Sequence, residues 1–222
     1  MEFIVCCLIG YLIGTFNPSF LFGKKKGVDI REKGSGNAGA SNTLILFGKS
    51  AGLICALIDI FKAYVAISVT NALFPHYDHT FVLTAVCCVL GHIFPFYMKF
   101  KGGKGLATLG GMILRYNSRL FLLMLALEIV IALVTGYICF VPVTASIAFP
   151  FIYGFIEKDI FGTVILLVLS VVIIFKHREN FKRIKNGTEM HLSYLWKPKA
   201  EMDRLRNNAD KEDEEFNDKF ML

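Results

Sequence analysis

The sequence predicts an all-α, polytopic membrane protein: a helix bundle with about seven transmembrane helices. Of its 222 residues, 55% are hydrophobic and 19% are charged, whereas a soluble domain carries about 25% charged residues. Apolar runs of roughly 15 to 22 residues recur along the chain between short polar or glycine-rich pieces, as in membrane-spanning helices. This composition excludes a cytosolic enzyme, a secreted disulfide scaffold and a disordered chain.

Seven apolar runs are expected to cross the membrane. They lie near residues 3–22, 51–73, 80–97, 106–117, 120–136, 138–156 and 160–176. Lysine and arginine concentrate in the expected loops 23–50 and 98–105 and in segment 176–190, whereas segment 74–79 has neither. Because positive residues are enriched on the cytoplasmic side of membrane proteins, we expect these three segments in the cytoplasm. The N-terminus would then lie outside and the C-terminus in the cytoplasm.

The fourth and fifth runs are short of residues. Two complete membrane helices need about 40 residues, but segment 106–136 has only 31. Either segment 106–117 is a short, partly submerged helix, or it re-enters the membrane without crossing it.

The charge distribution separates two regions. The net charge is +6, but residues 201–222 hold 8 acidic and 4 basic side chains, which leaves 20 basic and 10 acidic ones before them. We expect a membrane domain over residues 1–192 and a charged cytoplasmic tail over residues 193–222, of which the hydrophilic residues 197–222 are expected to be mobile or weakly helical. The basic residues lie in loops between apolar runs, so we expect no nucleic-acid partner.

The first segment that could carry chemistry is rich in glycine and small polar residues. It reads Gly34-Ser35-Gly36-Asn37-Ala38-Gly39-Ala40-Ser41-Asn42. It contains G-x-G-x-x-G, but it lies between two apolar runs and lacks the strand that a dinucleotide site requires. Closely spaced glycines let backbone N–H groups converge on an anion such as phosphate. The alternative is a flexible turn before the next helix.

The second segment combines glycines with lysines. It reads Gly91-His92, Pro95, then Lys99-Phe100-Lys101-Gly102-Gly103-Lys104-Gly105. It is not a phosphate-binding Walker loop, because Gly105 stands where a serine or threonine would follow the lysine. The loop opens a helix, so amides and ammonium groups together favour an anion. Cytoplasmic topology explains the lysines but not the glycines around Lys104.

The third segment follows the last apolar run. It reads His177-Arg178-Glu179-Asn180-Phe181-Lys182-Arg183-Ile184-Lys185-Asn186-Gly187-Thr188-Glu189. On a helix, His177, Asn180 and either Arg183 or Ile184 share one face. The alternative is a basic segment that binds lipid headgroups. Two charges inside the second run, Asp59 and Lys62, are expected to pair with each other.

Together these segments resemble the acyl-phosphate:glycerol-3-phosphate acyltransferases of bacterial membranes, the PlsY family, over roughly residues 7 to 190. The resemblance rests on three motifs: Val28-Asp29-Ile30-Arg31 before Gly34 to Asn42, Gly91-His92-x-x-Pro95 before Phe100 to Thr108, and His177-Arg178-x-Asn180 with Gly187 and Glu189. It implies a seven-span protein of the bacterial inner membrane that moves an acyl group from acyl phosphate to the sn-1 hydroxyl of glycerol 3-phosphate. Lysophosphatidate and phosphate would be released, with no cofactor or metal.

The implied site draws on all three motifs. Lys104 and the amides of Gly102, Gly103 and Gly105 are expected to hold the phosphate of glycerol 3-phosphate. The acyl phosphate headgroup is assigned to Gly34, Ser35, Gly36, Asn37 and Asn42, with Ser35 also catalytic. His177 is the first candidate general base, since imidazole titrates near pH 6.5, and a substrate phosphate oxygen is the alternative base. Asn180 is assigned to catalysis and Glu189 to substrate binding.

Two departures from the family pattern leave other functions open. Ile45 stands where the family usually has an arginine, and residues 136–146 lack the usual Arg-Tyr-x-Ser type of segment. Another cation such as Lys49 could compensate for Ile45. The alternatives are a non-catalytic or altered-specificity paralogue that binds phospholipid precursors, or an organic-phosphate transporter. Few polar residues interrupt the apolar runs, which disfavours a transporter.

Overall fold

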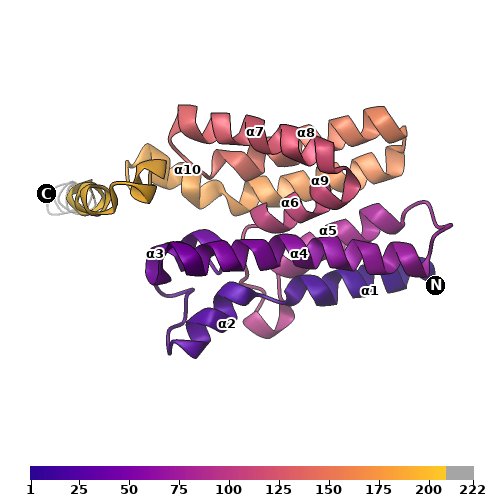
Figure 1. Ribbon diagram of the computed structural model, residues 1–222, viewed down its shortest axis with the longest axis horizontal. Coiled ribbons are helices and arrows are strands. Elements are labelled where there is room, and N and C mark those ends of the chain that lie inside the picture. Colours follow the sequence, from indigo (N-terminus) through magenta and orange to yellow (C-terminus); the bar gives the residue numbers. More distant parts are fainter. Residues whose placement is uncertain (209–222) are drawn as a thin grey trace, which may run out of the picture.

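The fold is built from helices alone over residues 1–208, the part of the chain that the computed structural model describes (Figure 1). The α-helices are α1 (Glu2–Thr15), α2 (Pro18–Lys25), α3 (Ala40–Phe47), α4 (Lys49–Leu73), α5 (Thr80–Ile93), α6 (Leu106–Tyr116), α7 (Ser118–Thr135), α8 (Phe140–Glu157), α9 (Ile160–Lys176) and α10 (Arg178–Lys185). Short 3₁₀ turns cover Phe96–Met98 and Leu192–Leu195. Residues 198–208 form a further helix, called the C-terminal helix below.

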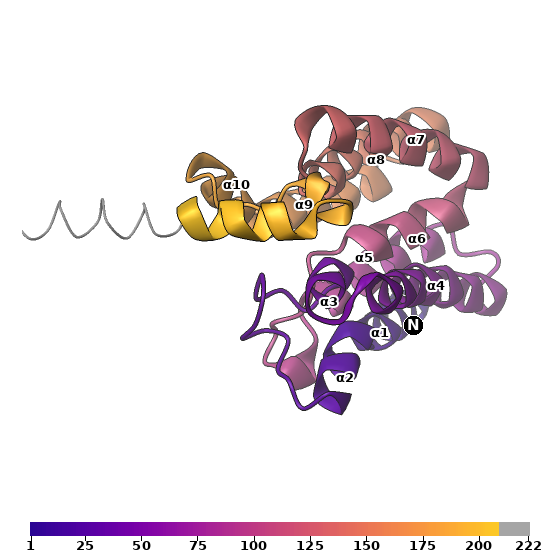
Figure 2. The same ribbon diagram turned by 60° about the vertical axis from the view of Figure 1, so that its left-hand side comes forward.

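The long helices form two groups that meet at α5 and α6 (Figures 1 and 2). In one group α1 packs on α5 and α4 packs on α6, and in the other α8 packs on α9. The shared core is apolar and includes Leu109 and Met112 of α6, Phe149 of α8 and Leu169 of α9. The outward faces of α4, α7 and α9 expose large apolar side chains, as expected of helices that face lipid.

The first expected span consists of two helices. α1 ends at Thr15, and the Asn17 side chain accepts a hydrogen bond from the Phe20 amide, capping α2 with Pro18 in its first turn. An Asn cap followed by proline starts a new helix, because proline lacks the N–H that a helix interior needs. The sequence therefore encoded this break.

Segment 23–50, predicted as a loop, contains a helix. α3 occupies Ala40–Phe47 and packs against α4. Gly52 of α4 permits this contact, since a Cβ there would lie 2.5 Å from the Leu44 Cβ. The loop prediction was thus wrong for these eight residues, because packing against α4 stabilises a helix too short to form alone.

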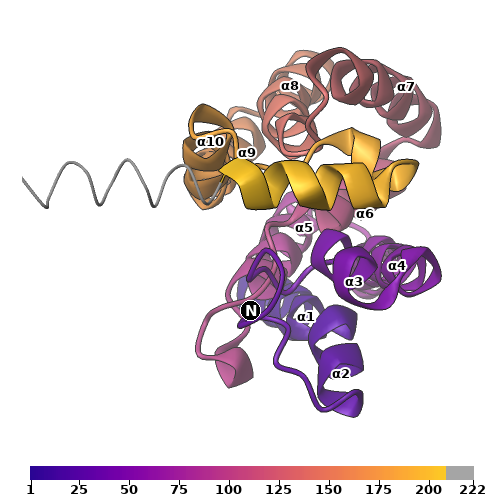
Figure 3. The ribbon, with the colours of Figure 1, turned by 90° about the vertical axis from the view of Figure 1, so that its left-hand side faces the viewer.

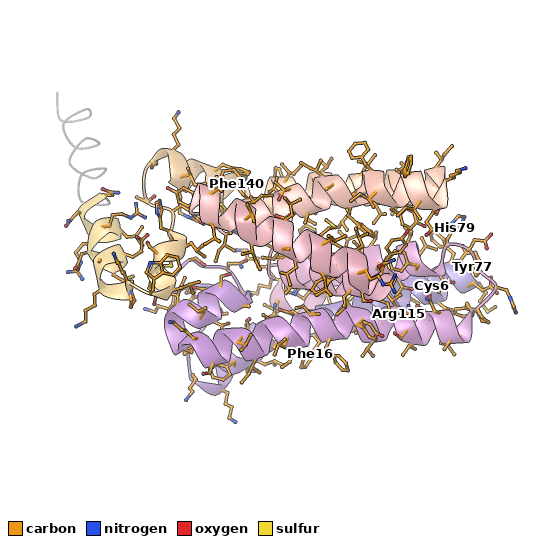
Figure 4. The ribbon with its side chains drawn as sticks, turned by 45° about the horizontal axis from the view of Figure 1, so that its top comes forward. Cys6, Phe16, Tyr77, His79, Arg115 and Phe140 are labelled. Atoms are coloured by element: carbon orange, nitrogen blue, oxygen red, sulfur yellow. The ribbon has the colours of Figure 1, made fainter. Side chains whose placement is uncertain are left out.

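The short segment 106–117 forms a single helix, α6. It has only 11 residues, and six other helical segments within residues 1–208 are long and apolar enough to cross a membrane. Its last turn reaches the far end of the bundle: Arg115 donates to Ser68 near the end of α4, and Tyr116 donates to Glu157 at the end of α8. Figure 4 shows Arg115 toward the end that carries Tyr77 and His79. This favours the short crossing helix over the re-entrant alternative.

The N-terminus and the C-terminal helix lie at opposite ends of the bundle (Figure 1). Phe140 and the three motif segments lie at the end away from Tyr77 (Figures 1 and 4). We call this end the motif end. Its assignment to the cytoplasm stays a prediction from the distribution of lysine and arginine.

The charges buried in α4 are paired, which confirms the expected contact. Lys62 Nζ lies 2.7 Å from Asp59 Oδ1, and both side chains are buried. His92 joins them from α5, with Nδ1 3.3 Å from the same carboxylate oxygen. Glu128, for which the sequence offers no partner, accepts a hydrogen bond of 2.6 Å from the Thr144 hydroxyl. Each of these buried groups thus has a polar contact, which membrane helices require.

The beginning of the predicted tail is folded onto the bundle. Residues 192–195 form a 3₁₀ turn and residues 198–208 a helix, and this helix contacts the segment after α10 through Glu201 and Arg204. Of the two states expected for the tail, mobile or weakly helical, residues 198–208 have the helical one, held by bonds between side chains of the tail and backbone groups of residues 187–191. The remaining part of the predicted tail, residues 209–222, lies outside the described residues.

Candidate active site

One cavity of about 500 Å³ collects all three motif segments at the motif end. Seen from this end, the C-terminal helix lies across it, between the α8–α9 group and the α3–α4 pair (Figure 3). The polar lining includes Ser35, Asn37, Lys104, His177, Asn180, Arg183 and Glu189, together with Ser41, Asp59, His92, Thr188, His191 and Tyr194. Segments far apart in the sequence thus share one site.

The first motif is a loop held from inside by Asn42. This side chain is fully buried. Its Oδ1 accepts from the Ser35 amide at 2.9 Å, and its Nδ2 donates to the carbonyls of Ile30 and Lys33. Gly34 has φ +60°, a left-handed conformation that favours glycine. Asn42 therefore shapes the loop and does not line the cavity.

The glycines of the second motif make a close backbone contact with the end of α5. The Gly102 amide donates to the Ile93 carbonyl at 3.0 Å, and the Gly103 amide donates to the His92 carbonyl at 3.1 Å. A Cβ at Gly102 would lie 2.1 Å from the His92 carbonyl oxygen. These glycines place Lys104 at the cavity. Their amides are engaged within the protein, which removes the reason for assigning them to phosphate.

Lys104 is the ammonium group of the site. Its Nζ donates to Asn180 Oδ1. Burial lowers the pKa of Lys104 to about 8, the Arg183 guanidinium adds to that effect, and the Glu189 carboxylate opposes it. At pH 7 the side chain is still mainly a cation, able to contact an anion at the N-terminus of α6.

The third motif crosses from the end of α9 into α10. His177 is buried, and its Nδ1 lies 2.8 Å from the Ile173 carbonyl oxygen. Because a carbonyl oxygen only accepts, Nδ1 carries the proton, and Nε2 keeps the lone pair of the neutral ring. Asn180 Nδ2 donates to Glu189 Oε1, and Arg183 Nε donates to Glu189 Oε2, each at 2.6 Å. Lys104, Asn180, Glu189 and Arg183 thus form one chain of polar contacts.

An apolar wall completes the cavity. It is formed by Leu44, Ile45, Ala56, Leu106, Ile138 and Pro142. Ile45, where the motif resemblance led us to expect an arginine, is thus part of an apolar surface of the cavity. Lys49, considered as a substitute cation, is exposed and is not among the lining residues. Burial raises the pKa of the Cys139 thiol, which also lines the cavity, to about 11, so it is protonated at neutral pH.

The predicted site residues divide into two sets. Those that line the cavity are Gly34, Ser35, Asn37, Lys104, Gly105, His177, Asn180 and Glu189; those that do not are Gly36, Asn42, Gly102 and Gly103. The prediction omitted Arg183, although its spacing of three from Asn180 puts both on one helix face. Within residues 1–208, no group of three His, Cys, Asp or Glu side chains is arranged to hold a metal ion.

The fold and the cavity define an integral membrane helix bundle with one polar site at its end, bordered by an apolar wall. The sequence matches the family described as glycerol-3-phosphate acyltransferase over residues 4–187. The chain belongs to this family, which confirms the resemblance seen in its motifs.

Two relatives and one solved structure show the extent of the likeness. The glycerol-3-phosphate acyltransferase of Bacillus subtilis (strain 168) is 37% identical over 196 residues, with 88% of this chain and 100% of the relative covered. That of Lactiplantibacillus plantarum is 34% identical over 207 residues, with 92% and 100% covered. The crystal structure of PlsY in its glycerol 3-phosphate form, an integral membrane glycerol 3-phosphate acyltransferase, has a TM-score of 0.80 at 28% identity, covering 88% of this chain and 98% of that chain.

Proposed function

We propose that this protein transfers a fatty acyl group from acyl phosphate to the sn-1 hydroxyl of glycerol 3-phosphate. The proposal rests above all on the composition of the cavity. A basic group at a helix N-terminus faces the same space as an apolar wall, and a reaction between a lipid-soluble donor and a small phosphate needs both. The named activity of the relatives supports the acceptor, and the donor rests on the motif resemblance.

The phosphate of glycerol 3-phosphate is assigned to Lys104 and the start of α6. The first amides of a helix have no partner within the helix and point along its axis, and Gly105 and Leu106 line the cavity at this point. Lys104 supplies a charge next to them. This assignment replaces the one that included the amides of Gly102 and Gly103.

The acyl phosphate is assigned to the first motif and the wall beside it. Ser35 and Asn37 line the cavity there, and their side chains offer hydrogen bonds to its headgroup and carbonyl oxygen. The fatty chain would lie along the wall that includes Leu44 and Ile45 of α3. With Ile45 in place of an arginine, this part of the cavity holds the headgroup by neutral groups.

The chemical step needs one base. The hydroxyl oxygen of glycerol 3-phosphate attacks the acyl carbonyl carbon, the bond between that carbon and the phosphate oxygen breaks, and phosphate leaves with the electron pair. The hydroxyl proton passes to Nε2 of His177, because Nδ1 is held by the Ile173 carbonyl. Asn180 and Glu189 keep Lys104 in place during the step.

The direct test is acyl transfer by the purified protein in detergent. Palmitoyl phosphate should yield lysophosphatidate, and palmitoyl coenzyme A, used as the comparison donor, should not. Phosphate flux in sealed vesicles without acyl transfer would instead indicate a carrier. Binding without either activity would indicate a non-catalytic paralogue.

The base is tested by His177→Ala. We expect a roughly 100-fold lower kcat at pH 7, within the range for loss of a general base. His76→Gln, in an exposed loop at the other end of the bundle, is the control. Near-normal turnover by folded His177→Ala would transfer the role to a substrate phosphate oxygen.

A further inference from the structure

The segment after the end of the family-model match forms part of the site. The match ends at residue 187. The next residues turn back over the cavity, where the Leu192 amide donates to the Gly136 carbonyl at 2.7 Å. The His191 ring packs edge-on against Tyr137, with ring centroids 4.4 Å apart. The C-terminal helix follows and adds Met202 and Leu205 to the lining of the cavity.

Glu201 fastens this helix to the segment before it. Its side chain is buried, with 4% exposed. Oε1 accepts from the His191 amide at 2.8 Å and also contacts Arg204 at 2.6 Å. Burial by itself would raise the pKa of Glu201, but the bonds from Arg204 and the His191 amide lower it. The carboxylate is therefore charged and engaged at neutral pH.

Arg204 extends the fastening to the backbone of the third motif. Its Nη1 donates to the Gly187 carbonyl and its Nη2 to the Glu189 carbonyl, each at 2.7 Å. Asn208, one turn further along the helix, also donates to the Gly187 carbonyl at 2.8 Å. A planar guanidinium that joins two carbonyls and one carboxylate holds all three in a set geometry. The backbone on both sides of Thr188 is thereby held.

The held backbone carries a side chain of the site. Glu189 accepts bonds from Asn180 and Arg183, and the other end of the Asn180 amide accepts from Lys104. A shift of Glu189 would free the Asn180 amide to rotate. Lys104 would then face an amide N–H in place of an oxygen and lose its acceptor.

We propose that Glu201 and Arg204 are positioning residues of the acyltransferase, which act through Glu189 and Asn180 to hold the Lys104 ammonium where the phosphate of glycerol 3-phosphate binds. The C-terminal helix thus lines the active site and helps to position its residues. This inference rests on the proposed role of Lys104 in binding that phosphate.

The test compares three variants of the full-length protein in the palmitoyl phosphate assay. Arg204→Met removes the guanidinium and keeps an unbranched apolar stem. Glu201→Gln keeps an oxygen that can accept from the His191 amide and removes the ion pair. Arg206→Met is the matched control, since Arg206 lies on the same helix and is exposed.

The expected result is a selective loss of affinity for the acceptor. For Arg204→Met and Glu201→Gln, the KM for glycerol 3-phosphate should rise roughly tenfold, the effect of one weakened charge-assisted contact. The KM for palmitoyl phosphate should stay close to that of the unsubstituted protein. The melting temperature of Arg204→Met should fall, because the buried Glu201 carboxylate loses its cation, and Arg206→Met should match the unsubstituted protein in every parameter. If Arg204→Met does not fold, Glu201→Gln alone decides.

Two results would overturn the inference. One is unchanged KM values in both folded variants. The other is a lower melting temperature with unchanged kinetics, since that is the signature of a purely structural contact. Lys104→Met tests separately the proposal that Lys104 binds the phosphate. If Lys104→Met leaves the KM for glycerol 3-phosphate unchanged, that phosphate assignment fails. If Lys104→Met raises that KM while Arg204→Met does not, only the role of the C-terminal helix fails.

Discussion

Replacing Lys104 with methionine removes the ammonium group from the cavity and keeps most of the side-chain volume. The substitution removes the hydrogen bond from Nζ to the Asn180 side chain, but the glycines before Lys104 stay held by backbone bonds. The change therefore removes the charge and this hydrogen bond without disturbing the loop backbone. Lys101→Met, at an exposed position of the same loop, controls for loss of a positive charge at the surface.

The magnitude follows from the kind of hydrogen bond that the substitution removes from the bound phosphate. A hydrogen bond to a charged group contributes about 1.5 to 3 kcal/mol, and each 1.4 kcal/mol is about a factor of ten. We therefore expect kcat/KM for glycerol 3-phosphate to fall roughly 10- to 150-fold at pH 7. The Lys101→Met variant should change it less than about twofold, as exposed charges contribute little.

The pH dependence gives an independent measure of the same group. A lysine with a pKa of about 8 is charged below that pH and neutral above it. The kcat/KM of the unsubstituted protein should therefore be high at pH 7 and fall as pH rises through 8, since this ratio reports the free enzyme. Lys104→Met should lose this alkaline decline.

The assay measures initial rates of lysophosphatidate formation in detergent from about pH 6.5 to 9.5, a range that brackets the titration of Lys104. Glycerol 3-phosphate is varied at saturating palmitoyl phosphate, and folding is checked by melting temperature. An unchanged KM for glycerol 3-phosphate in folded Lys104→Met would refute the assignment. If the kcat/KM of Lys104→Met falls over the same pH range as that of the unsubstituted protein, another group is responsible for the decline.

Two further predictions concern stability, measured by thermal unfolding of the purified protein in detergent. Gly14→Ala should prevent close packing of α1 on α5 and lower the melting temperature strongly, because the new Cβ would lie 2.1 Å from the Cys88 carbonyl oxygen. Gly110→Ala is the control and should change the melting temperature little, because its Cβ would meet its nearest atom at 3.6 Å. Equal melting temperatures for the two variants would contradict the packing of α1 on α5. Lys62→Met should cost about 3 to 5 kcal/mol by leaving the buried Asp59 carboxylate without its cation, and a melting temperature equal to that of the unsubstituted protein would show that the pair contributes nothing.

Local features of the chain were enough to predict the class of fold and the residue types of the site. Long apolar runs form membrane helices, because backbone groups in lipid must be hydrogen-bonded within their own segment. This requirement can be judged from the sequence of each segment alone. The pairing of Asp59 with Lys62 is likewise local. The helix start at Asn17 and Pro18 is also local, although the predicted span 3–22 ran through it. The three motif segments also carried the family resemblance, because their polar residues are few and stand out in an apolar chain.

Which groups face the cavity depends instead on how distant segments pack. Whether the amides of Gly102 and Gly103 are free depends on the carbonyls at the end of α5, and no local pattern records that approach. The reach of α6 to the far end of the bundle likewise depends on Arg115 meeting Ser68, 47 residues away in sequence.

The tail shows the same limit most clearly. Residues 197–208 are mostly polar or charged, a composition that left both a mobile segment and a weak helix open. The bonds of Glu201 and Arg204 to backbone groups of residues 187–191 make them part of the bundle. The partners of these side chains lie in the segment after α10, so the position of the C-terminal helix depends on contacts that its own composition does not show.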